Sequence, residues 1–412
     1  MSSASTVSAL DESISWLRST GAVRERCRML FDAAKRGELE HARLDLDRLD
    51  AAADYVTRVI RDSYPALDIP YHSRWRHFAM GLDRWGPVAA EIHGASEQAR
   101  AAADLAVVSV LLDAGAGDRW SYAEQGVGGT LARSEGLAVA SLHMFYDGAF
   151  SSDHKHRLQV DAEALEALTD AHLAHGFQVS HENPLVGLAS RAELLRRLGK
   201  ALGARPEIFG APARPGALID HLLKGARDKR VSAHALLALL LDVLAPIWPS
   251  GLVLHGVNLG DVARHRLARG AGATDRLVPF HKLSQWLAYS LIEPLEWAGA
   301  TVTGLDALTG LPEYRNGGLF VDAGVIVPRG QLASGSALDP RSEPVVEWRA
   351  LTVVLLDEIA PRVRRRLGVD AATLPLAKVL QGGTWTAGRR IAREKRPDGV
   401  PPIDVATDGT TF

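Results

Sequence analysis

The spacing of apolar residues along this chain predicts a series of amphipathic helices. Apolar side chains recur at steps of three and four from Leu46 to Ile60, and Pro65 follows them. This spacing places side chains on one face of an α-helix and the proline marks its end, so we expect a helix there. The same kind of pattern predicts helices at about 96–115, 161–176, 190–203, 216–226, 232–245, 280–298, 345–367 and 385–395.

Capping residues and prolines suggest where some of these helices begin and end. Asp161 is expected to cap one N-terminus, and Ser190 with Glu193 has the spacing of a capping box. Pro294 and Pro361 are expected to kink or end their helices because proline lacks the N–H that an inner helical turn requires.

Strand signals are short and irregular, which indicates a mainly α protein with a few short β-hairpins. The candidates are residues 143–145, 177–180 and 319–327, and they form no regular alternation with helices. We expect a single helical unit over residues 1–396, in which Pro206–Pro215 is the place where two lobes would divide. Residues 397–412 are rich in proline, glycine and aspartate and are expected to form an irregular tail.

Charge and cysteine content exclude several classes of protein. The 412 residues include 47 basic and 49 acidic side chains, a net charge of −2, so the basic excess typical of nucleic-acid or anionic-membrane binding is absent. A small anionic substrate stays open, because a few arginines in a pocket leave the net charge unchanged. Cys27 is the only cysteine, which rules out an intrachain disulfide and a cysteine-based zinc site.

Targeting and membrane signals are also missing from the pattern. The chain reaches Asp11 and Glu12 early, without a basic region followed by an apolar core, so we expect no signal peptide. The most apolar stretch, Ala235–Leu254, contains Asp242 and two prolines and is interpreted as a buried helix. We therefore expect a soluble cytoplasmic protein.

Standard cofactor and metal motifs fail when their spacing is tested. Leu131 stands where the dinucleotide fingerprint needs a third glycine after Gly126 and Gly128. No Walker phosphate loop, nucleophile elbow or His-Glu-x-x-His occurs. Paired histidines at 154 and 156 and at 172 and 175 are interpreted as surface residues, so we expect no metal and no cofactor.

A first polar cluster lies at residues 71–78. It places His72, Arg74 and Arg76 among aromatic residues that include Trp75. Arginine binds phosphate or carboxylate through two N–H groups and aromatic rings stack on planar ligands, so the cluster suits an anionic or planar substrate. The alternative is a helix interface held by stacked arginines. A weaker group at 133–136 carries an arginine and a glutamate.

A second polar cluster lies on the helix expected at 280–298. His281, Lys282, Gln285 and Tyr289 fall on one narrow face, and apolar residues cover the other side. Buried lysine and glutamine need polar partners, so this face favours a polar cavity. The alternative is an ordinary amphipathic surface helix.

A third cluster, at residues 311–322, places an acid, a phenol, an arginine and an amide in sequence. Glu313 stands in a turn that starts a short helix, where free backbone N–H groups orient a carboxylate. Gly317 and Gly318 allow close approach of a neighbouring backbone. The alternative is a Glu–Arg ion pair that fixes the turn.

These blocks resemble the family of proteins tied to the fungal and bacterial uracil-catabolism route that opens with a cyclohydrolase-like ring cleavage. The resemblance rests on residues 71–78, Trp120 with 133–136, 280–294 and 308–325, and it covers about residues 20–395. It implies a role in pyrimidine breakdown.

A more distant likeness concerns mechanism. Residues 279–285, followed by Leu308-Thr309 and Glu313-Tyr314-Arg315, are similar to paired blocks of the queuosine-salvage nucleoside hydrolases. Those proteins are mainly helical, resemble DNA glycosylases and cleave an N-glycosidic bond with an aspartate where Glu313 stands. The likeness implies a helical, DNA-glycosylase-like core. This chain also has Gly317-Gly318 where that group has Pro-Gln, which argues for a different leaving group.

The resulting hypothesis is an N-ribosyl hydrolase that splits a ribosyl-urea, or its 5-phosphate, into urea and ribose or ribose phosphate. The carboxylate role falls to Glu313, with Lys282 and Asp322 as further catalytic candidates. The expected substrate-binding residues are His281, Gln285, Tyr289, Tyr314, Arg315, Asn316, His72, Arg74, Trp75, Arg76, Arg133 and Glu135. The expected partner is a small riboside or ribotide, without nucleic acid or membrane.

Two other functions compete with this hypothesis. One is a non-enzymatic ligand-binding or scaffold protein of the same pathway, which the lack of a complete catalytic motif favours. The other is a uracil phosphoribosyltransferase, whose α/β sheet and paired acids after an apolar strand the sequence does not match.

Overall fold

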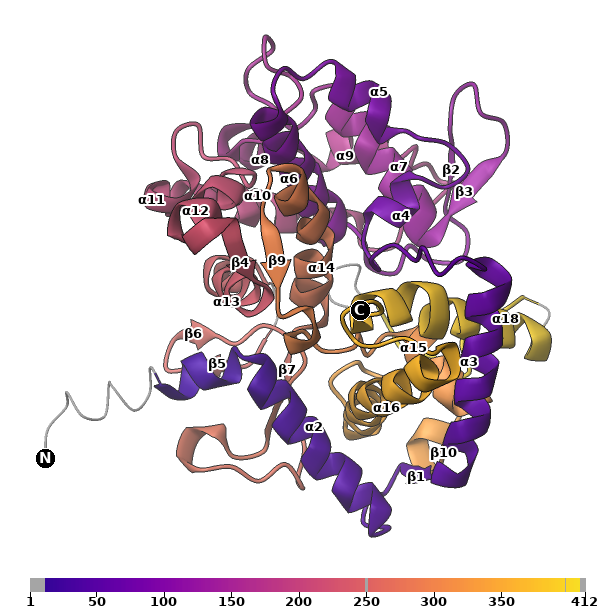
Figure 1. Ribbon diagram of the computed structural model, residues 1–412. Coiled ribbons are helices and arrows are strands. Elements are labelled where there is room, and N and C mark those ends of the chain that lie inside the picture. Colours follow the sequence, from indigo (N-terminus) through magenta and orange to yellow (C-terminus); the bar gives the residue numbers. More distant parts are fainter. Residues whose placement is uncertain (1–11, 249–250, 397, 408–412) are drawn as a thin grey trace, which may run out of the picture. The chain divides into compact units, whose positions relative to one another are not determined.

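The computed structural model describes residues 12–248, 251–396 and 398–407, and it shows a mainly α protein with short two-stranded sheets (Figure 1). This confirms the expected fold class. The first eleven residues, on which the expectation about a signal peptide rests, and tail residues 397 and 408–412 lie outside the described residues. Within the described part of the chain, no helix is long and apolar enough to cross a membrane.

The chain divides into two compact units, neither of which is a continuous segment. Unit 1 consists of Met1–His72, Gly251–Gln285 and Gly304–Ala406, and unit 2 of Ser73–Ser250, Trp286–Thr303 and Thr407–Phe412. The segment Pro206–Pro215, which the sequence offers as a division between lobes, lies inside unit 2.

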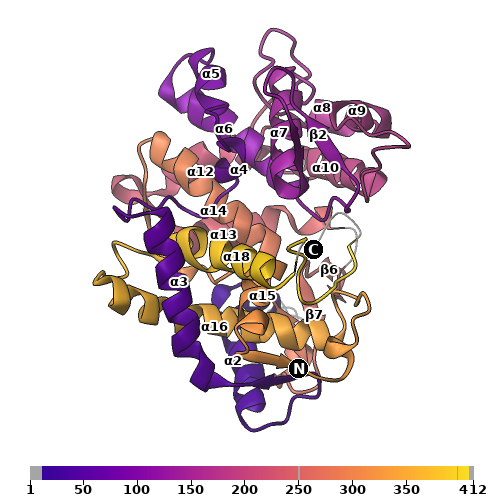
Figure 2. The same cartoon turned by 90° about the vertical axis from the view of Figure 1, so that its right-hand side faces the viewer.

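Unit 1 is built around one long helix. Helix α16 (Glu343–Leu367) packs against α2 (Thr20–Lys35), α3 (Leu49–Ser63) and α15 (Tyr314–Asp322). Helix α15 also packs along α18 (Trp385–Lys395), and Figure 2 shows these helices as one layered group. The short helix α17 (Leu376–Lys378) leads into a π-helical segment at Val379–Thr384 and then into α18.

Glycines let α15 pack closely against its neighbours. A Cβ added at Gly317 would lie 2.6 Å from the Trp348 ring of α16, and one at Gly388 of α18 would collide with the Arg315 carbonyl. The Gly317-Gly318 pair is closely approached by the side chains of Trp348 and Pro402, and not by a neighbouring backbone as expected.

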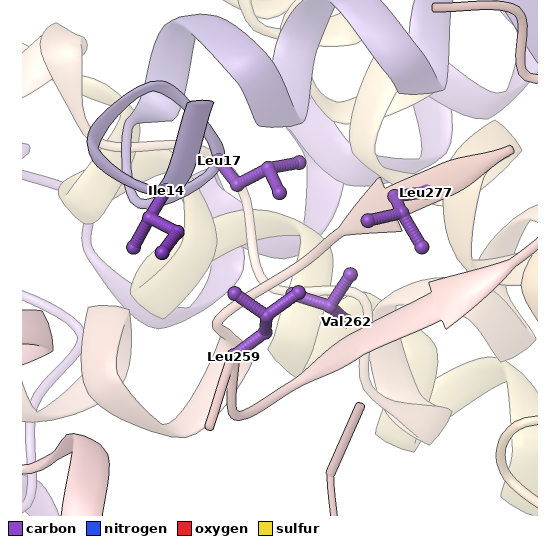
Figure 3. Packing of buried hydrophobic residues seen from close by; sticks show 5 residues of the cluster. All are labelled: Ile14, Leu17, Leu259, Val262 and Leu277. Atoms are coloured by element: carbon purple, nitrogen blue, oxygen red, sulfur yellow. The ribbon is translucent and has the colours of Figure 1, made fainter. Parts of the chain in front are cut away.

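Three antiparallel strand pairs complete unit 1. Strand β1 (Ala42–Leu44) pairs with β10 (Ile326–Pro328), β5 (Val253–Leu254) with β6 (Val257–Asn258), and β7 (Val262–Arg264) with β8 (Leu277–Pro279). A hydrophobic cluster fastens the β7–β8 hairpin to the helical residues 12–17 (Figure 3). Its buried members are Ile14, Leu17, Leu259, Val262 and Leu277.

Unit 2 contains most of the remaining helices. They are α4 (Trp75–Phe78), α5 (Trp85–Ala90), α6 (Ala95–Leu111), α7 (Arg133–Tyr146), α8 (Ala162–Ala167), α9 (Asp170–Gly176), α10 (Leu188–Gly203), α11 (Pro206–Phe209), α12 (Ala217–Gly225) and α13 (Ala233–Val243). Its strand pairs are antiparallel β2 (Ser121–Ala123) with β3 (Thr130–Ala132), and parallel β4 (Arg230–Ser232) with β9 (Thr301–Thr303). Helix α14 (Lys282–Trp297) begins in unit 1 and continues in unit 2.

Most predicted helices occur, and several predicted ends are wrong. The Asp161 side chain accepts the Ala164 N–H at 3.0 Å as expected, but the predicted helix 161–176 is two helices, because Thr169 caps a second one. Ser190 lies inside α10, so the proposed capping box is wrong. Neither Pro294 nor Pro361 ends its helix.

The predicted strands are mostly wrong. Residues 143–145 belong to α7, and 177–180 form no strand. The first part of 319–327 is the end of α15, and only its last two residues enter β10. Such short apolar runs fit a buried helical turn as well as a strand, because a few residues do not separate the two periods.

Candidate functional site

Glu313 is the N-cap of α15 and the centre of the candidate site. Its two carboxylate oxygens accept the backbone N–H groups of Arg315 at 2.7 Å and Asn316 at 2.6 Å. Glutamate is not among the preferred N-cap residues, which are asparagine, aspartate, serine, threonine and glycine. The side chain is only 8% exposed, so a carboxylate that ordinarily faces water is held here against the positive end of a helix.

Burial raises the pKa of Glu313 above its ordinary value. The two backbone N–H groups and the charges of Lys282 and Arg315 oppose this rise, because they favour the ionised form. Glu313 is therefore a carboxylate with a raised pKa and with two cations near it, an arrangement typical of acid–base groups in active sites.

Lys282 is the first residue of α14, and the β7–β8 hairpin fixes its main chain. The Asp261 carboxylate, just before β7, accepts the Lys282 N–H at 2.9 Å and binds Arg349 through both oxygens at 2.9 and 2.7 Å. Burial raises the pKa of Asp261, but its bonds to Arg349 and the Lys282 N–H outweigh burial and hold it below its usual value. Asp261 thus fixes the start of the helix that carries the lysine near Glu313.

His281, the residue before Lys282, is held in place by a hydrogen bond to the main chain. Its Nε2–H donates to the Leu17 carbonyl at 2.8 Å, and its backbone has a φ of 50° in the left-handed region. Burial lowers the pKa of His281, so the ring is neutral near pH 7. A left-handed conformation at a residue other than glycine costs energy and is common at functional sites.

The side chains of Gln285 and Asn316 bind main-chain groups and threonine hydroxyls of the protein itself. The Gln285 amide contacts Phe280 and Thr309, and the Asn316 amide contacts Leu311 and Thr384. Both side chains are fully buried. Their proposed substrate-binding role stays a prediction, although these contacts favour a positioning role.

The rest of the third cluster is spread along α15. Arg315 donates to the Gly399 carbonyl at 3.0 Å and lies over the Tyr314 ring, with its Cζ 4.9 Å from the ring centroid. Asp322 forms a two-bond ion pair with Arg396 at 2.8 and 2.5 Å. It stands nine residues after Glu313, about 13 Å away along a straight helix. The structure therefore does not bring Asp322 to Glu313.

His72 lies in unit 1 beside the π-helical segment. Its Nδ1 is 2.9 Å from Gln381 Oε1, and its ring centroid is 5.7 Å from that of Trp385. A π-helical turn is rare and occurs often at functional sites. The sequence reasoning missed Gln381 and this turn, and no signal in a single sequence separates it from an α-helix.

The remaining candidates lie in unit 2. Arg74 is fully buried, forms an ion pair with Asp113 at 3.0 Å and donates to Ser109 at 2.7 Å. Burial lowers the pKa of Arg74, while Asp113 and Glu135 oppose this. The interpretation as an arginine-held helix interface fits these contacts.

Other residues of the unit 2 clusters have varied surroundings. Arg76 pairs with Glu293, and Trp75 packs edge-to-face against Phe78, Trp85 and Trp297. Glu135 is buried in the first turn of α7. Arg133 is exposed with a φ of 54°, and Tyr289 is fully buried in α14.

Asp261, Arg349 and Thr309 are further site residues that sequence analysis did not propose. They come from distant segments and meet only through the fold, so no local spacing reveals them. Across 12–248, 251–396 and 398–407, no group of three or more histidine, cysteine, aspartate or glutamate side chains is arranged to hold a metal ion.

The fold and the site define a mainly helical protein with a buried carboxylate at a helix N-terminus beside a lysine. The chain belongs to the family described as "Protein of unknown function (DUF1688)", whose model matches residues 16–412. It is 38% identical to "Uracil catabolism protein 4" of Lachancea kluyveri, covering 98% of this chain and 100% of that protein. It is 39% identical to "Protein urg3" of Schizosaccharomyces pombe, covering 97% and 99%. The family expected from the sequence is confirmed.

Proposed function

We propose that this protein acts in uracil catabolism as an N-ribosyl hydrolase that splits ribosyl-urea, or its 5-phosphate, into urea and ribose or ribose phosphate. The name of the Lachancea kluyveri relative supports the pathway. The observation that carries the chemistry is the Glu313 carboxylate, which is buried and oriented at the N-terminus of α15 near Lys282.

Cleavage of an N-glycosidic bond passes through a transition state with positive charge on the sugar ring. The ionised Glu313 stabilises that charge and takes a proton from the attacking water. The water oxygen bonds to the anomeric carbon as the carbon–nitrogen bond breaks. The departing nitrogen accepts a proton, so one water is consumed and urea is released.

Lys282 is the proposed proton donor to the departing nitrogen. Its charge acts on Glu313, whereas Asp322 is paired with Arg396 and His281 with Leu17. A lysine ammonium also keeps the neighbouring carboxylate ionised, which the stabilising role requires.

The test is urea release from synthetic ribosyl-urea, with and without the 5-phosphate, by the wild type and Glu313→Gln. Loss of a general acid or base lowers rates by about 10²–10⁴-fold, so we expect a loss of that size. Glu347→Gln is a matched control, because Glu347 is fully buried and also accepts two backbone N–H groups, those of Glu40 and His41.

Three results would contradict the proposal. Near-normal turnover by Glu313→Gln would remove Glu313 from the mechanism. No release by the wild type from either substrate would overturn the hydrolase function. Binding without turnover, seen as a thermal shift by the ribosides, would favour a ligand-binding protein of the pathway.

The uracil phosphoribosyltransferase alternative loses support. That class has an α/β sheet, whereas the described residues of this chain form only two-stranded sheets.

A further inference from the structure

The loop that leads into Glu313 is held by a single side chain of α14. Gln285 Nε2 donates to the Thr309 hydroxyl oxygen at 2.6 Å and to the Phe280 carbonyl at 2.9 Å. Gln285 Oε1 accepts the Thr309 N–H at 2.7 Å. Both residues are fully buried, so these bonds form away from competing water. We call this contact the Gln285–Thr309 bridge.

A second contact holds the same loop closer to Glu313. Asn316 Nδ2 donates to the Leu311 carbonyl at 3.1 Å, and Asn316 Oδ1 accepts the Thr384 hydroxyl at 2.8 Å. Thr384 belongs to the π-helical segment, and Arg24 of α2 donates to the Ala307 and Leu308 carbonyls just before the bridge, so several elements fix the loop. The backbone is thus fixed four and two residues before the carboxylate.

The bridge joins the two charged residues of the candidate site. Gln285 follows Lys282 by three residues, which places both on neighbouring turns of one face of α14. The helix that carries the cation therefore also holds the loop that carries the carboxylate. The start of that helix is fixed in turn by Asp261, which accepts the Lys282 N–H.

We propose that Gln285 and Thr309 are positioning residues, which fix the Lys282 ammonium and the Glu313 carboxylate against each other. A bridge that served only to satisfy buried polar groups would affect stability and leave the interaction between the two charges unchanged. The proposal rests on the proposed function only for its effect on turnover. Its effect on the charge interaction needs no substrate.

The first test measures the interaction between the two charges. The Glu313 carboxyl is titrated by carbon-13 NMR, with its signal assigned by comparison with Glu313→Gln, before and after Lys282→Met. The Lys282 charge lowers the pKa of Glu313, so Lys282→Met should raise that pKa in the wild type. In the Thr309→Val background, we expect Lys282→Met to raise the pKa of Glu313 by at most half as much.

Thr352→Val is the matched control. Thr352 is also buried, and its hydroxyl donates at 2.8 Å to the Trp348 carbonyl of its own helix, far along the chain from the bridge. In the Thr352→Val background, Lys282→Met should raise the Glu313 pKa by the full wild-type amount. The same full rise is expected in Thr309→Ser, which keeps the hydroxyl. An equal rise in wild type and Thr309→Val would overturn the proposal. If Thr309→Val does not fold, Thr309→Ala removes the same hydroxyl without added bulk and is judged in the same way.

The second test is kinetic. If the wild type releases urea from ribosyl-urea, Thr309→Val should lower kcat about tenfold with KM nearly unchanged, because substrate contacts are kept while the charges are displaced. A raised KM with unchanged kcat would overturn the positioning role in favour of substrate binding. If the wild type releases no urea, the proposed function fails, and the titration alone still decides the positioning role.

Discussion

At the scale of single residues, the candidate site depends on the Glu313 carboxylate, which is buried in the protein. Burial of Glu313 disfavours its charge, and two N–H groups, Lys282 and Arg315 offset that cost only in part. A protein selected for stability alone would place a shorter acid or a serine at this helix N-terminus. A residue that breaks a local preference and has a raised pKa is typical of a functional site.

The raised pKa of Glu313 predicts how stability changes with pH. Below glutamate's ordinary pKa of 4.5, both the folded and the unfolded protein hold the proton. As the pH rises from there towards the raised value, the unfolded state loses the proton first, so the wild type loses stability. Glu313→Gln has no such loss. We expect its melting temperature relative to the wild type to rise over this window and then stay constant, measured by circular dichroism.

Glu124→Gln is the control with the opposite sign. The Arg84 guanidinium lowers the pKa of Glu124, with two bonds at 2.8 and 2.6 Å. The stability from this pair is present above pH 4.5 and is lost as the pH falls through the lowered pKa. Relative to the wild type, Glu124→Gln should therefore become less stable as the pH rises. The same trend in both variants would argue against a raised pKa for Glu313.

Removal of the Lys282 charge should change the pH dependence of turnover. That charge lowers the pKa of Glu313, so Lys282→Met raises it and leaves less ionised carboxylate at a given pH. The acidic limb of the kcat/KM profile should move to higher pH, and kcat should fall about 10²-fold or more. Lys282→Arg keeps the charge and should keep the limb in place. An acidic limb that does not move in Lys282→Met would show that the Lys282 charge does not act on the pKa of Glu313.

At the scale of elements, α15 is positioned by close packing at glycines. The Gly388 position of α18 faces the Arg315 carbonyl, and Gly317 faces the Trp348 ring. These contacts fix the helix whose N-terminus orients Glu313. The geometry of the site therefore depends on positions that carry no chemistry of their own.

Gly388→Ala should destabilise the protein by about 1–3 kcal/mol, because the new methyl group meets backbone that has to move. Gly225→Ala is the comparison, since an added Cβ at this exposed position at the end of α12 meets nothing within 4 Å. It should stabilise by about 0.4–1 kcal/mol. Urea unfolding measures both. Equal effects at the two positions would show that close packing at Gly388 does not matter.

At the scale of the whole molecule, both units are assembled from segments that are distant in sequence. Unit 2 needs residues 286–303, because β9 pairs with β4 and Trp297 packs against Trp75 at a centroid distance of 4.7 Å. Unit 1 likewise brings Asp261, Lys282 and Glu313 together from two of its three segments.

This organisation predicts that the continuous part of unit 2 is not sufficient for folding. A fragment of residues 73–250 lacks β9 and Trp297, so β4 has no partner strand and Trp75 loses a ring contact. We expect the fragment to show no cooperative thermal transition by near-ultraviolet circular dichroism, whereas the full chain shows one. A cooperative transition at the full chain's midpoint would contradict the assignment of 286–303 to this unit.

Sequence patterns predicted the helices well where the pattern was long. The α3, α14, α16 and α18 regions follow the spacing of their apolar residues, because side chains three and four apart share a face. The short runs at 143–145 and 177–180 were assigned wrongly to strands, since three or four residues fit either period. The π-helical turn at Val379–Thr384 was missed for a similar reason, because its sequence also fits an α-helix.

The sequence by itself determined the fold class, the family and the two clusters that contain Lys282 and Glu313. These depend on local spacing and on residue type, which a single chain displays directly. Only the tertiary structure decided that Asp322 lies at the far end of α15 and that Gln285 binds Thr309. It also decided that Asp261 and Arg349 fix the start of α14. Contacts between segments dozens of residues apart arise from packing of whole elements, and no local pattern encodes them.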